Sequence, residues 1–400
     1  MQDVKYQLGP ASKVRYCVQK TMRLRLQFNL KSFLIATTLA GVLVGTIGNQ
    51  VYLRWQSEVE LQKALVRRQA ARKSLINIGG HLKEEGDVIV SVQFPQRACR
   101  SKDFALLADL TGLENLDLSQ SGFKDSDTPV LEAQKSVKRL TLAGNEQISD
   151  VGLVAIGKFD SLEVLDLSLT GISDEGLKTI GDARRLRGLG LAKTKVTSAG
   201  LSHLRDLQSL RSLNLAYTDV DDDALPAIGK LSGLRSLNLD GTKVSGTGLA
   251  ALHNLKTLKT FHLHACPLQD GTGLAELDQV VELSLECELP DGFLRNIHKM
   301  ENLRTLTLDG SVLKDSQLKE LEDATQLTRL NLCRTAITDD GIIHLATLKS
   351  LKNVSLLDTR VTEDGARALA VQIPKTLIQT SHGSRKGLKP WERRELTKAN

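Results

Sequence analysis

The feature that most constrains this 400-residue chain is a short pattern, L-x-x-L-x-L, that recurs at a nearly constant interval. A sustained period of about 24 residues is typical of a solenoid, in which each repeat packs only against its neighbours. Counting back one period from the first copy reaches Ile89, where IVSVQF predicts a degenerate capping unit. The copies that begin at Leu258 and Val280 are shorter than the others. Aligned copies begin at Leu113, Val137, Leu162, Leu186, Leu210, Leu234, Leu258, Val280, Leu303, Leu327 and Leu351.

The copy LEVLDLSLTGISDEGL, from Leu162 to Leu177, shows what each repeat is expected to fold into. Leu165 and Leu167 alternate with more polar residues, which predicts a short strand whose leucines face inward. Ser173 stands before two acids, and this is the chemistry of a helix start. We therefore expect one strand and one short helix per repeat, stacked with the strands parallel.

A small polar residue occupies the ninth position of most copies. Such a residue at a buried bend needs a hydrogen-bond partner. We expect these side chains to form a ladder of hydrogen bonds to loop backbone between adjacent coils. They are Thr170, Thr194, Thr218, Thr242, Cys266, Thr335 and Thr359.

These motifs resemble the leucine-rich-repeat family, whose signature is L-x-x-L-x-L-x-x-N/C-x-L. The resemblance covers residues 88–380, and Asn145 and Cys266 keep the family's own letters at the ninth position. The frequent Thr there and the I-[ST]-D-x-G-L phrase are most similar to the cysteine-containing, ribonuclease-inhibitor-like subtype. The resemblance implies an α/β fold: a right-handed solenoid with a curved parallel sheet inside and short helices outside. It also implies binding rather than catalysis.

The first 87 residues differ from the repeats. Residues 1–31 are basic, and residues 32–53 form an uninterrupted uncharged run, long enough to cross a membrane as one helix. We predict a transmembrane signal anchor there, with a cleaved signal peptide as the alternative. Residues 54–87 are expected to form a juxtamembrane helical stalk, and residues 381–400 a basic tail.

The orientation of this anchor is not decided by basic residues, because six Lys or Arg lie in residues 12–31 and six in residues 54–73. The order of segments resembles bacterial signal-anchored leucine-rich-repeat proteins, which implies a single-pass protein with a cytoplasmic N-terminus and repeats outside. The family-like opening begins at Met22. Residues 1–21 are therefore either a short cytoplasmic tail or the product of an upstream start.

Catalytic and cofactor motifs are not found. The segment GLGLAKT, from Gly188 to Thr194, lacks the glycines of a phosphate-binding loop, since Arg187 and Ala192 stand in their places. The 5 cysteines are scattered and contain no C-x-x-C pair, so neither a disulfide framework nor a zinc knuckle is expected. We predict a non-enzymatic protein without a cofactor.

Residues that point outward from the strands vary between copies and would form the surface offered to other molecules. In the middle copies they include two histidines and several acids, and neighbouring carboxylates attract cations. We predict that this concave face binds a protein or peptide with basic groups. The predicted partner-binding residues are Tyr217, Asn238, Asp240, His262, His264, Glu282, Glu286, Asp309 and Arg334.

Two other functions stay open. His262 and His264, with Asp240, Glu286 or Asp309, offer ligands for a divalent metal in a metal-binding protein or a metal-dependent enzyme. The chain could instead be a cytosolic substrate adaptor like those of ubiquitin ligases, although no F-box-like segment precedes the repeats. Nucleic acid is not an expected partner, because the formal charge of +6 comes mainly from the two ends of the chain.

Overall fold

The computed structural model describes residues 43–96, 99–157, 159–381 and 383–386. Residue contacts divide the chain into two units, Met1–Ala70 and Ala71–Asn400. Helix α3 (Leu43–Asn77) begins in the first unit and ends in the second. Within the described part of the chain, no helix combines the length and the apolar character that a membrane crossing requires. Residues 1–31 and the first part of the predicted anchor, residues 32–42, lie outside that part.

The second unit opens with a hairpin. Helix α3 ends at Asn77, and Gly79 follows with a φ of 89°, a left-handed conformation that glycine adopts without strain. Strands β1 (His81–Glu85) and β2 (Val88–Gln93) then pair antiparallel. Strand β2 also pairs in parallel with β3 (Asn115–Asp117), so the IVSVQF segment forms the first strand of the parallel array.

The strands of the described residues form one 15-stranded sheet in chain order. Strands β2 to β14 pair in parallel, and one antiparallel strand closes each end. The register aligns the fourth residue of every copy, so that Leu213 pairs with Leu237 and Leu237 with Phe261. The other strands are β4 (Arg139–Thr141), β5 (Val164–Asp166), β6 (Gly188–Gly190), β7 (Ser212–Asn214), β8 (Ser236–Asn238), β9 (Thr260–His262), β10 (Glu282–Ser284), β11 (Thr305–Thr307), β12 (Arg329–Asn331), β13 (Asn353–Leu356), β14 (Leu377–Thr380) and β15 (Gly383–Lys386).

The inward face of the strands forms the core. Leu165 and Leu167 are almost completely buried, whereas Val164 and Asp166 on the same strand are partly exposed. The alternation predicted for the copy at Leu162 is therefore confirmed. The same positions in neighbouring coils join one continuous apolar cluster, because stacking places equivalent leucines over one another.

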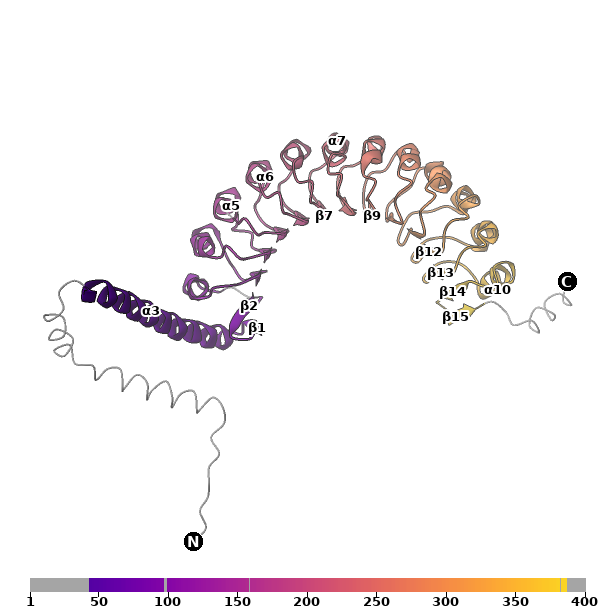
Figure 1. The fold of residues 1–400 in the computed structure, drawn as a ribbon. Helices are drawn as coiled ribbons and strands as arrows, with labels where there is room; N and C mark the ends of the chain where they lie inside the picture. The colour runs from indigo at the N-terminus through magenta and orange to yellow at the C-terminus, as the bar shows by residue number, and fades with distance from the viewer. Residues whose placement is uncertain (1–42, 97–98, 158, 382, 387–400) are drawn as a thin grey trace, which may run out of the picture. The chain divides into compact units, whose positions relative to one another are not determined.

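Each parallel strand from β3 to β13 is followed by at least one short helix on the other side of its coil. Within the second unit, the strands line the inner side of an arc and the helices its outer side (Figure 1). This arrangement confirms the predicted solenoid with a curved parallel sheet. The α-helices are α4 (Ser101–Phe104), α5 (Asp150–Ile156), α6 (Asp174–Ile180), α7 (Leu225–Ile228), α8 (Asp315–Leu318), α9 (Asp339–Ile342) and α10 (Glu363–Gln372). The 3-10 helices are η1 (Ala105–Asp109), η2 (Asp125–Ala133), η3 (Ser198–Leu204), η4 (Asp222–Ala224), η5 (Leu249–Asn254), η6 (Thr272–Glu276), η7 (Phe293–Lys299), η8 (Lys319–Leu321) and η9 (Ile343–Thr347).

The helix starts connect neighbouring coils. Ser173 caps α6 as predicted, because its hydroxyl accepts the N–H of Glu175 at 3.3 Å. Its own N–H and O–H both donate to Asp150 of the preceding coil, at 2.9 and 2.6 Å. We call this pair of bonds a rung. Equivalent rungs join Asp125 to Ser149, Asp174 to Thr197, Asp222 to Ser245, Asp315 to Thr338 and Asp339 to Thr362.

The rungs also explain the glycine of the I-[ST]-D-x-G-L phrase. A Cβ placed on Gly176 would lie 2.5 Å from the carboxylate oxygen Oδ1 of Asp150, which is closer than side-chain carbons approach. Gly152 stands in the same relation to Asp125, also at 2.5 Å. Two residues of the phrase therefore serve the same contact. The Ser or Thr donates to the aspartate of the previous coil, and the glycine leaves space for the carboxylate of that aspartate.

The ninth-position threonines bond differently from the prediction. Thr170, Thr218 and Thr242 each donate to the carbonyl three residues earlier, at 2.5, 2.6 and 2.6 Å. These bonds stay within one coil, so the expected ladder between coils is wrong for threonine. The threonine hydroxyl is short and bonds to the backbone of its own bend, although the hydroxyl of Thr242 also contacts the thiol of Cys266 in the next coil at 3.6 Å. The longer Asn145 reaches both its own coil, at Leu142, and the preceding one, at Leu118.

The two short copies, which begin at Leu258 and Val280, interrupt the rungs. In the first of them Gln269 follows the apolar Leu268, at the place where other copies have the Ser or Thr of a rung. Asp270 accepts from Thr272 within its own coil, at 2.8 and 2.7 Å. At the start of η7, which belongs to the second short copy, Glu320 of the next coil accepts the N–H of Gly292 at 2.6 Å. These two coils are therefore joined to their neighbours by other bonds than the rungs.

Candidate functional site

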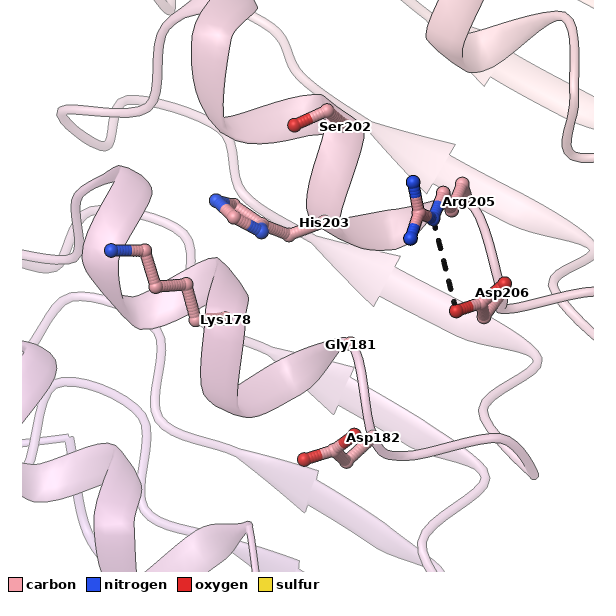
Figure 2. Close-up of a pocket in the computed structure, with 7 residues that line it drawn as sticks. All are labelled: Lys178, Gly181, Asp182, Ser202, His203, Arg205 and Asp206. Atoms are coloured by element: carbon pink, nitrogen blue, oxygen red, sulfur yellow. Dashed lines mark ion pairs between the residues drawn. The ribbon is translucent and has the colours of Figure 1, made fainter.

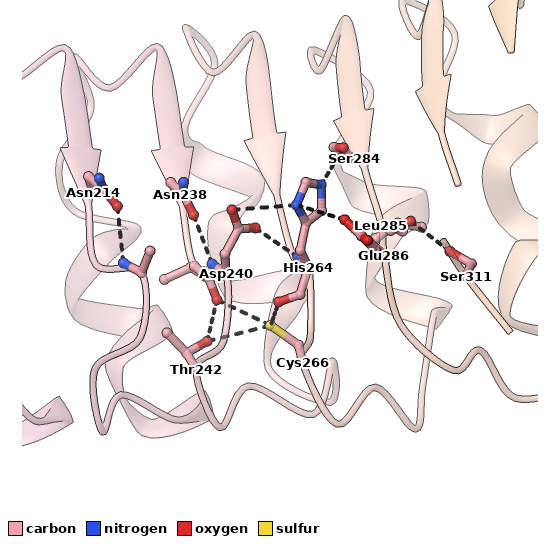
Figure 3. A network of polar contacts seen from close by, with 12 residues as sticks. Asn214, Asn238, Asp240, Thr242, His264, Cys266, Ser284, Leu285, Glu286 and Ser311 are labelled. Carbon is pink, nitrogen blue, oxygen red and sulfur yellow. Dashed lines mark hydrogen bonds and ion pairs between the residues drawn. The ribbon is translucent and has the colours of Figure 1, made fainter. Parts of the chain in front are cut away.

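A network of polar side chains lies on the strand side, just after β8 to β12. It is centred on Asp240, His264 and Glu286, which occupy the seventh position of three successive copies (Figure 3). Parallel strands in register place these residues side by side, although they are far apart along the chain. Three predicted site residues are therefore brought together by the register of the sheet.

The ends of the strands fix the backbone beneath this network. Asn238 accepts the N–H of Asp240 at 2.8 Å, and Asn214 does the same for Ala216 at 3.0 Å. In the next copy a histidine, His262, stands at the asparagine position. The N–H of His264 donates instead to Oδ1 of Asp240, at 2.8 Å. Asn238 thus holds its own strand end, and one oxygen of Asp240 is fixed by the following coil.

The ring of His264 lies between two carboxylates and a hydroxyl. Its Nδ1 is 3.6 Å from Oδ2 of Asp240 and 3.8 Å from Oε2 of Glu286. Its Nε2 is 2.5 Å from the hydroxyl oxygen of Ser284. The side chains of Asp240 and His264 are only 14% and 27% exposed, so these groups meet in a partly dehydrated environment where their electrostatic interactions are strengthened.

His262 stands beside His264 with the rings edge to face, at a centroid distance of 5.7 Å and an interplanar angle of 76°. Burial lowers the pKa of His262, and the neighbouring His264 lowers it further, whereas Asp240 and Glu282 act in the opposite direction. A lowered pKa favours the neutral imidazole of His262, which keeps a nitrogen lone pair. Asp240, His262 and His264 each offer one ligand atom within 4.8 Å of the others, the one such group among the described residues.

Arg334 partly neutralises the carboxylates of the predicted concave face. Its guanidinium donates to both oxygens of Asp309, at 2.9 and 3.0 Å, and to Glu286 at 3.3 Å. The hydrogen bond to Asp309 and the charges of both acids raise the pKa of Arg334. Two of the four carboxylates in the predicted set, Glu286 and Asp309, therefore share a cation already. Glu282 is exposed at the start of β10.

Tyr217 borders this network, because its backbone N–H donates to the carbonyl of Asp240 at 2.6 Å. It is 55% exposed, with a φ of 56°, and its ring packs over Gly241 of the next coil, where a Cβ would collide with it. The ammonium of Lys193 lies 5.1 Å from the ring centroid, a cation–π contact. Arg334 has a similar φ of 55°. Both residues stand at the eighth position, where the backbone turns away from the strand.

Two residues of the site were absent from the predicted set. Ser284 contacts His264, and Lys193 covers Tyr217. The signal for Ser284 was its place at the fifth position, in the row that contains His262. Lys193 shares the eighth position with Tyr217, one copy earlier.

A cavity of about 380 Å³ opens beside the shortened copies. It is lined by residues that follow β9 and β10, and burial raises the pKa of the nearby thiol of Cys287 to about 12. Burial also raises the pKa of Cys266. These thiols are therefore protonated at neutral pH and poor nucleophiles. The lining residues are Cys266, Pro267, Leu268, Gln269, Glu288 and Pro290.

A second cavity, of about 360 Å³, lies on the helix side between α6 and η3 (Figure 2). Lys178 and Arg205 face it together with Asp182 and Asp206, so its charges are mixed. The ammonium of Lys178 is held by Glu175 at 2.6 Å, and Arg205 lies 3.9 Å from Asp206. No side chains of one charge converge in this cavity, which makes it a weaker candidate than the strand-side network. Gly181, Ser202 and His203 complete its lining.

Comparison with known protein families gives a match over residues 136–371, to the family described as a leucine-rich repeat region. This segment is more than half of the chain and includes every predicted site residue. The search of curated proteins gave no match.

Solved structures share the fold at low sequence identity. An internalin, inlF, of Listeria monocytogenes is 20% identical, with a TM-score of 0.55, over 73% of this chain and 79% of its own. Internalin C2 of the same organism is 25% identical, with a TM-score of 0.42, over 49% and 80%. The mouse RP105/MD-1 complex is 17% identical, with a TM-score of 0.49, over 74% and 54%. At these identities the likeness to inlF concerns the fold alone.

Proposed function

The chain belongs to the leucine-rich-repeat family, and from that premise we propose that it is a membrane-anchored module whose concave face binds a protein partner. Proteins of this family are typically binding modules without catalytic activity. The concave face is the strand side described above. One observation carries the choice of this face. It presents Tyr217, Arg334 and Glu282 as exposed groups on a backbone that is fixed by hydrogen bonds between neighbouring coils.

The chemistry of these groups supports a protein partner. Tyr and Arg are enriched where interfaces concentrate their binding energy, because each combines a large contact area with a polar end. The surface is ordered before binding, so little conformational entropy is lost on association. Glu282 favours a partner with basic groups, and Arg334, which bonds to Asp309 and Glu286 through Nε and Nη2, can donate from Nη1 to an acceptor of the partner. The expected partner segment therefore carries both charges.

Photo-crosslinking in cells tests the choice of face. A photoreactive phenylalanine analogue replaces Glu282 in one variant and Glu175, an exposed acid of α6 on the helix side, in the matched control. We expect a specific adduct from position 282, lost when Arg334→Glu is added, and no such adduct from position 175. Equal adducts from both positions, or an adduct from 282 that Arg334→Glu leaves unchanged, would contradict binding at the concave face.

The membrane part of the proposal rests on residues 32–53 and on the side chains at and just after the end of that segment. Tyr52, Leu53 and Trp55 are all more than half exposed on α3, and the two aromatic rings stack at 6.2 Å. Exposed Tyr and Trp at the end of an apolar segment are typical of a membrane interface. We propose a cytoplasmic N-terminus with the repeats outside.

Protease protection tests the location and the orientation together. A tag placed after Asn400 is expected to remain in the membrane fraction after a high-salt wash and to be digested by protease added to intact cells or spheroplasts. A tag in the soluble fraction would contradict the anchor. A membrane-bound tag that is digested only after lysis would contradict the orientation and favour the cytosolic adaptor.

A further inference from the structure

We propose that Asp240, His262 and His264 bind one divalent transition-metal ion on the concave face. The three residues come from two adjacent coils, and the register of β8 and β9 brings them together. Their ligand atoms all lie within 4.8 Å of one another. The site goes beyond partner recognition, since it requires no other protein to form.

The separation of the donor atoms fits an ion better than a direct bond between the side chains. Nδ1 of His264 and Oδ2 of Asp240 are 3.6 Å apart, beyond the range of an N–H···O hydrogen bond. Two ligands bound at about 2.0–2.1 Å to one zinc ion with tetrahedral angles lie about 3.3–3.5 Å apart. This pair needs only a small adjustment to reach that geometry, and the third donor, on His262, lies within 4.8 Å of both.

Other contacts hold these donors in place. Asp240 gives one oxygen, Oδ1, to the N–H of His264 at 2.8 Å, which leaves Oδ2 facing the imidazole. In the proposed site Nε2 of His264 carries the ring proton and donates to Ser284, so that Nδ1 keeps its lone pair for the metal. Metal-binding histidines commonly donate their second ring N–H in this way, which fixes the tautomer and the ring orientation.

The donor set selects the class of metal. Two imidazoles and one carboxylate suit zinc and its neighbours in the transition series, whereas calcium and magnesium prefer oxygen donors alone. Glu286 places Oε2 at 3.8 Å from Nδ1 of His264 and can supply a fourth donor. Since the three side chains are only partly buried, water or a group of another molecule can fill the remaining position.

Metal titration of the purified full-length chain, without a polyhistidine tag, tests the proposal. Zinc chloride alone is titrated by calorimetry after dialysis against a chelator, and cobalt chloride is followed through its visible absorption. We expect one strong equivalent of zinc per chain and a cobalt spectrum of tetrahedral or five-coordinate type. Because no partner is present, the outcome is independent of the proposed recognition function.

The decisive variant is His262→Gln, because Asp240 also accepts the backbone N–H of His264 and the ring of His264 also contacts Ser284. We expect it to weaken zinc binding at least about 100-fold, since loss of a ligand exceeds the effect of losing an outer contact. The matched control, His253→Gln, alters a histidine of η5 on the helix side and should bind as the wild type does. Circular dichroism checks that both variants are folded. The proposal is overturned if the wild type binds no stoichiometric zinc, or if His262→Gln retains its affinity.

Discussion

The rungs between coils predict a large loss of stability from a single carboxylate. Asp174 accepts the N–H of Thr197 at 2.8 Å and its hydroxyl at 2.6 Å, from the following coil. Asp174→Ala removes both acceptors and leaves a partly buried N–H without its partner. A hydrogen bond to a charged group contributes about 1.5–3 kcal/mol, so we expect a loss of about 2–4 kcal/mol in the free energy of unfolding.

The adjacent residue supplies the control. Glu175 is also an acid in the first turn of α6, but its carboxylate contacts only the exposed Lys178 among the described residues, at 2.6 Å. Exposed pairs of this kind contribute less than about 1 kcal/mol. Glu175→Ala therefore changes the net charge and the helix start by a similar amount without breaking a rung.

Equilibrium urea unfolding compares the two variants, and amide hydrogen exchange locates the effect. Each coil contacts only its neighbours, so faster exchange should be concentrated in the coils that contain Asp174 and Thr197. If Asp174→Ala loses no more stability than Glu175→Ala, the rungs do not stabilise the stack and the reasoning is refuted. Accelerated exchange spread evenly over all coils would contradict its local origin.

Two further predictions concern other polar groups. Thr218→Val and Thr242→Val should each lower the free energy of unfolding by about 1 kcal/mol, and their effects in urea should add, because neither hydroxyl bonds to the coil of the other threonine. Strong coupling in the double variant would contradict this and favour a ladder between coils. Burial raises the pKa of Asp222, but hydrogen bonds from Ser245 and from the N–H groups of Gly248 and Gly246 outweigh burial and leave it below the ordinary 3.8. A lowered pKa in the folded state stabilises the fold above about pH 4, and this stabilisation is lost as the pH falls through the folded pKa. Asp222→Asn should therefore flatten the acid side of the stability–pH curve. An unchanged slope would contradict this prediction.

Much of the concave face could be predicted because it follows from period and alternation. His262, His264 and Glu286 were found as outward residues of successive copies, and the sheet places them where the pattern indicates. Their contacts could not be predicted. Arg334 bonds to Glu286 from two coils away, and a repeating pattern does not state which way a long side chain turns.

The sequence by itself determined the repeat, the inward leucines and the strand and helix of each coil, because these depend on spacings along the chain. Only the tertiary structure decided which side chains of different coils meet. Asp174 reaches Thr197, whereas the hydroxyl of Thr170 stays with its own coil. The physical reason is reach: a bond forms when the distance between stacked coils matches the length and direction of a side chain, and that distance exists only after the coils have packed.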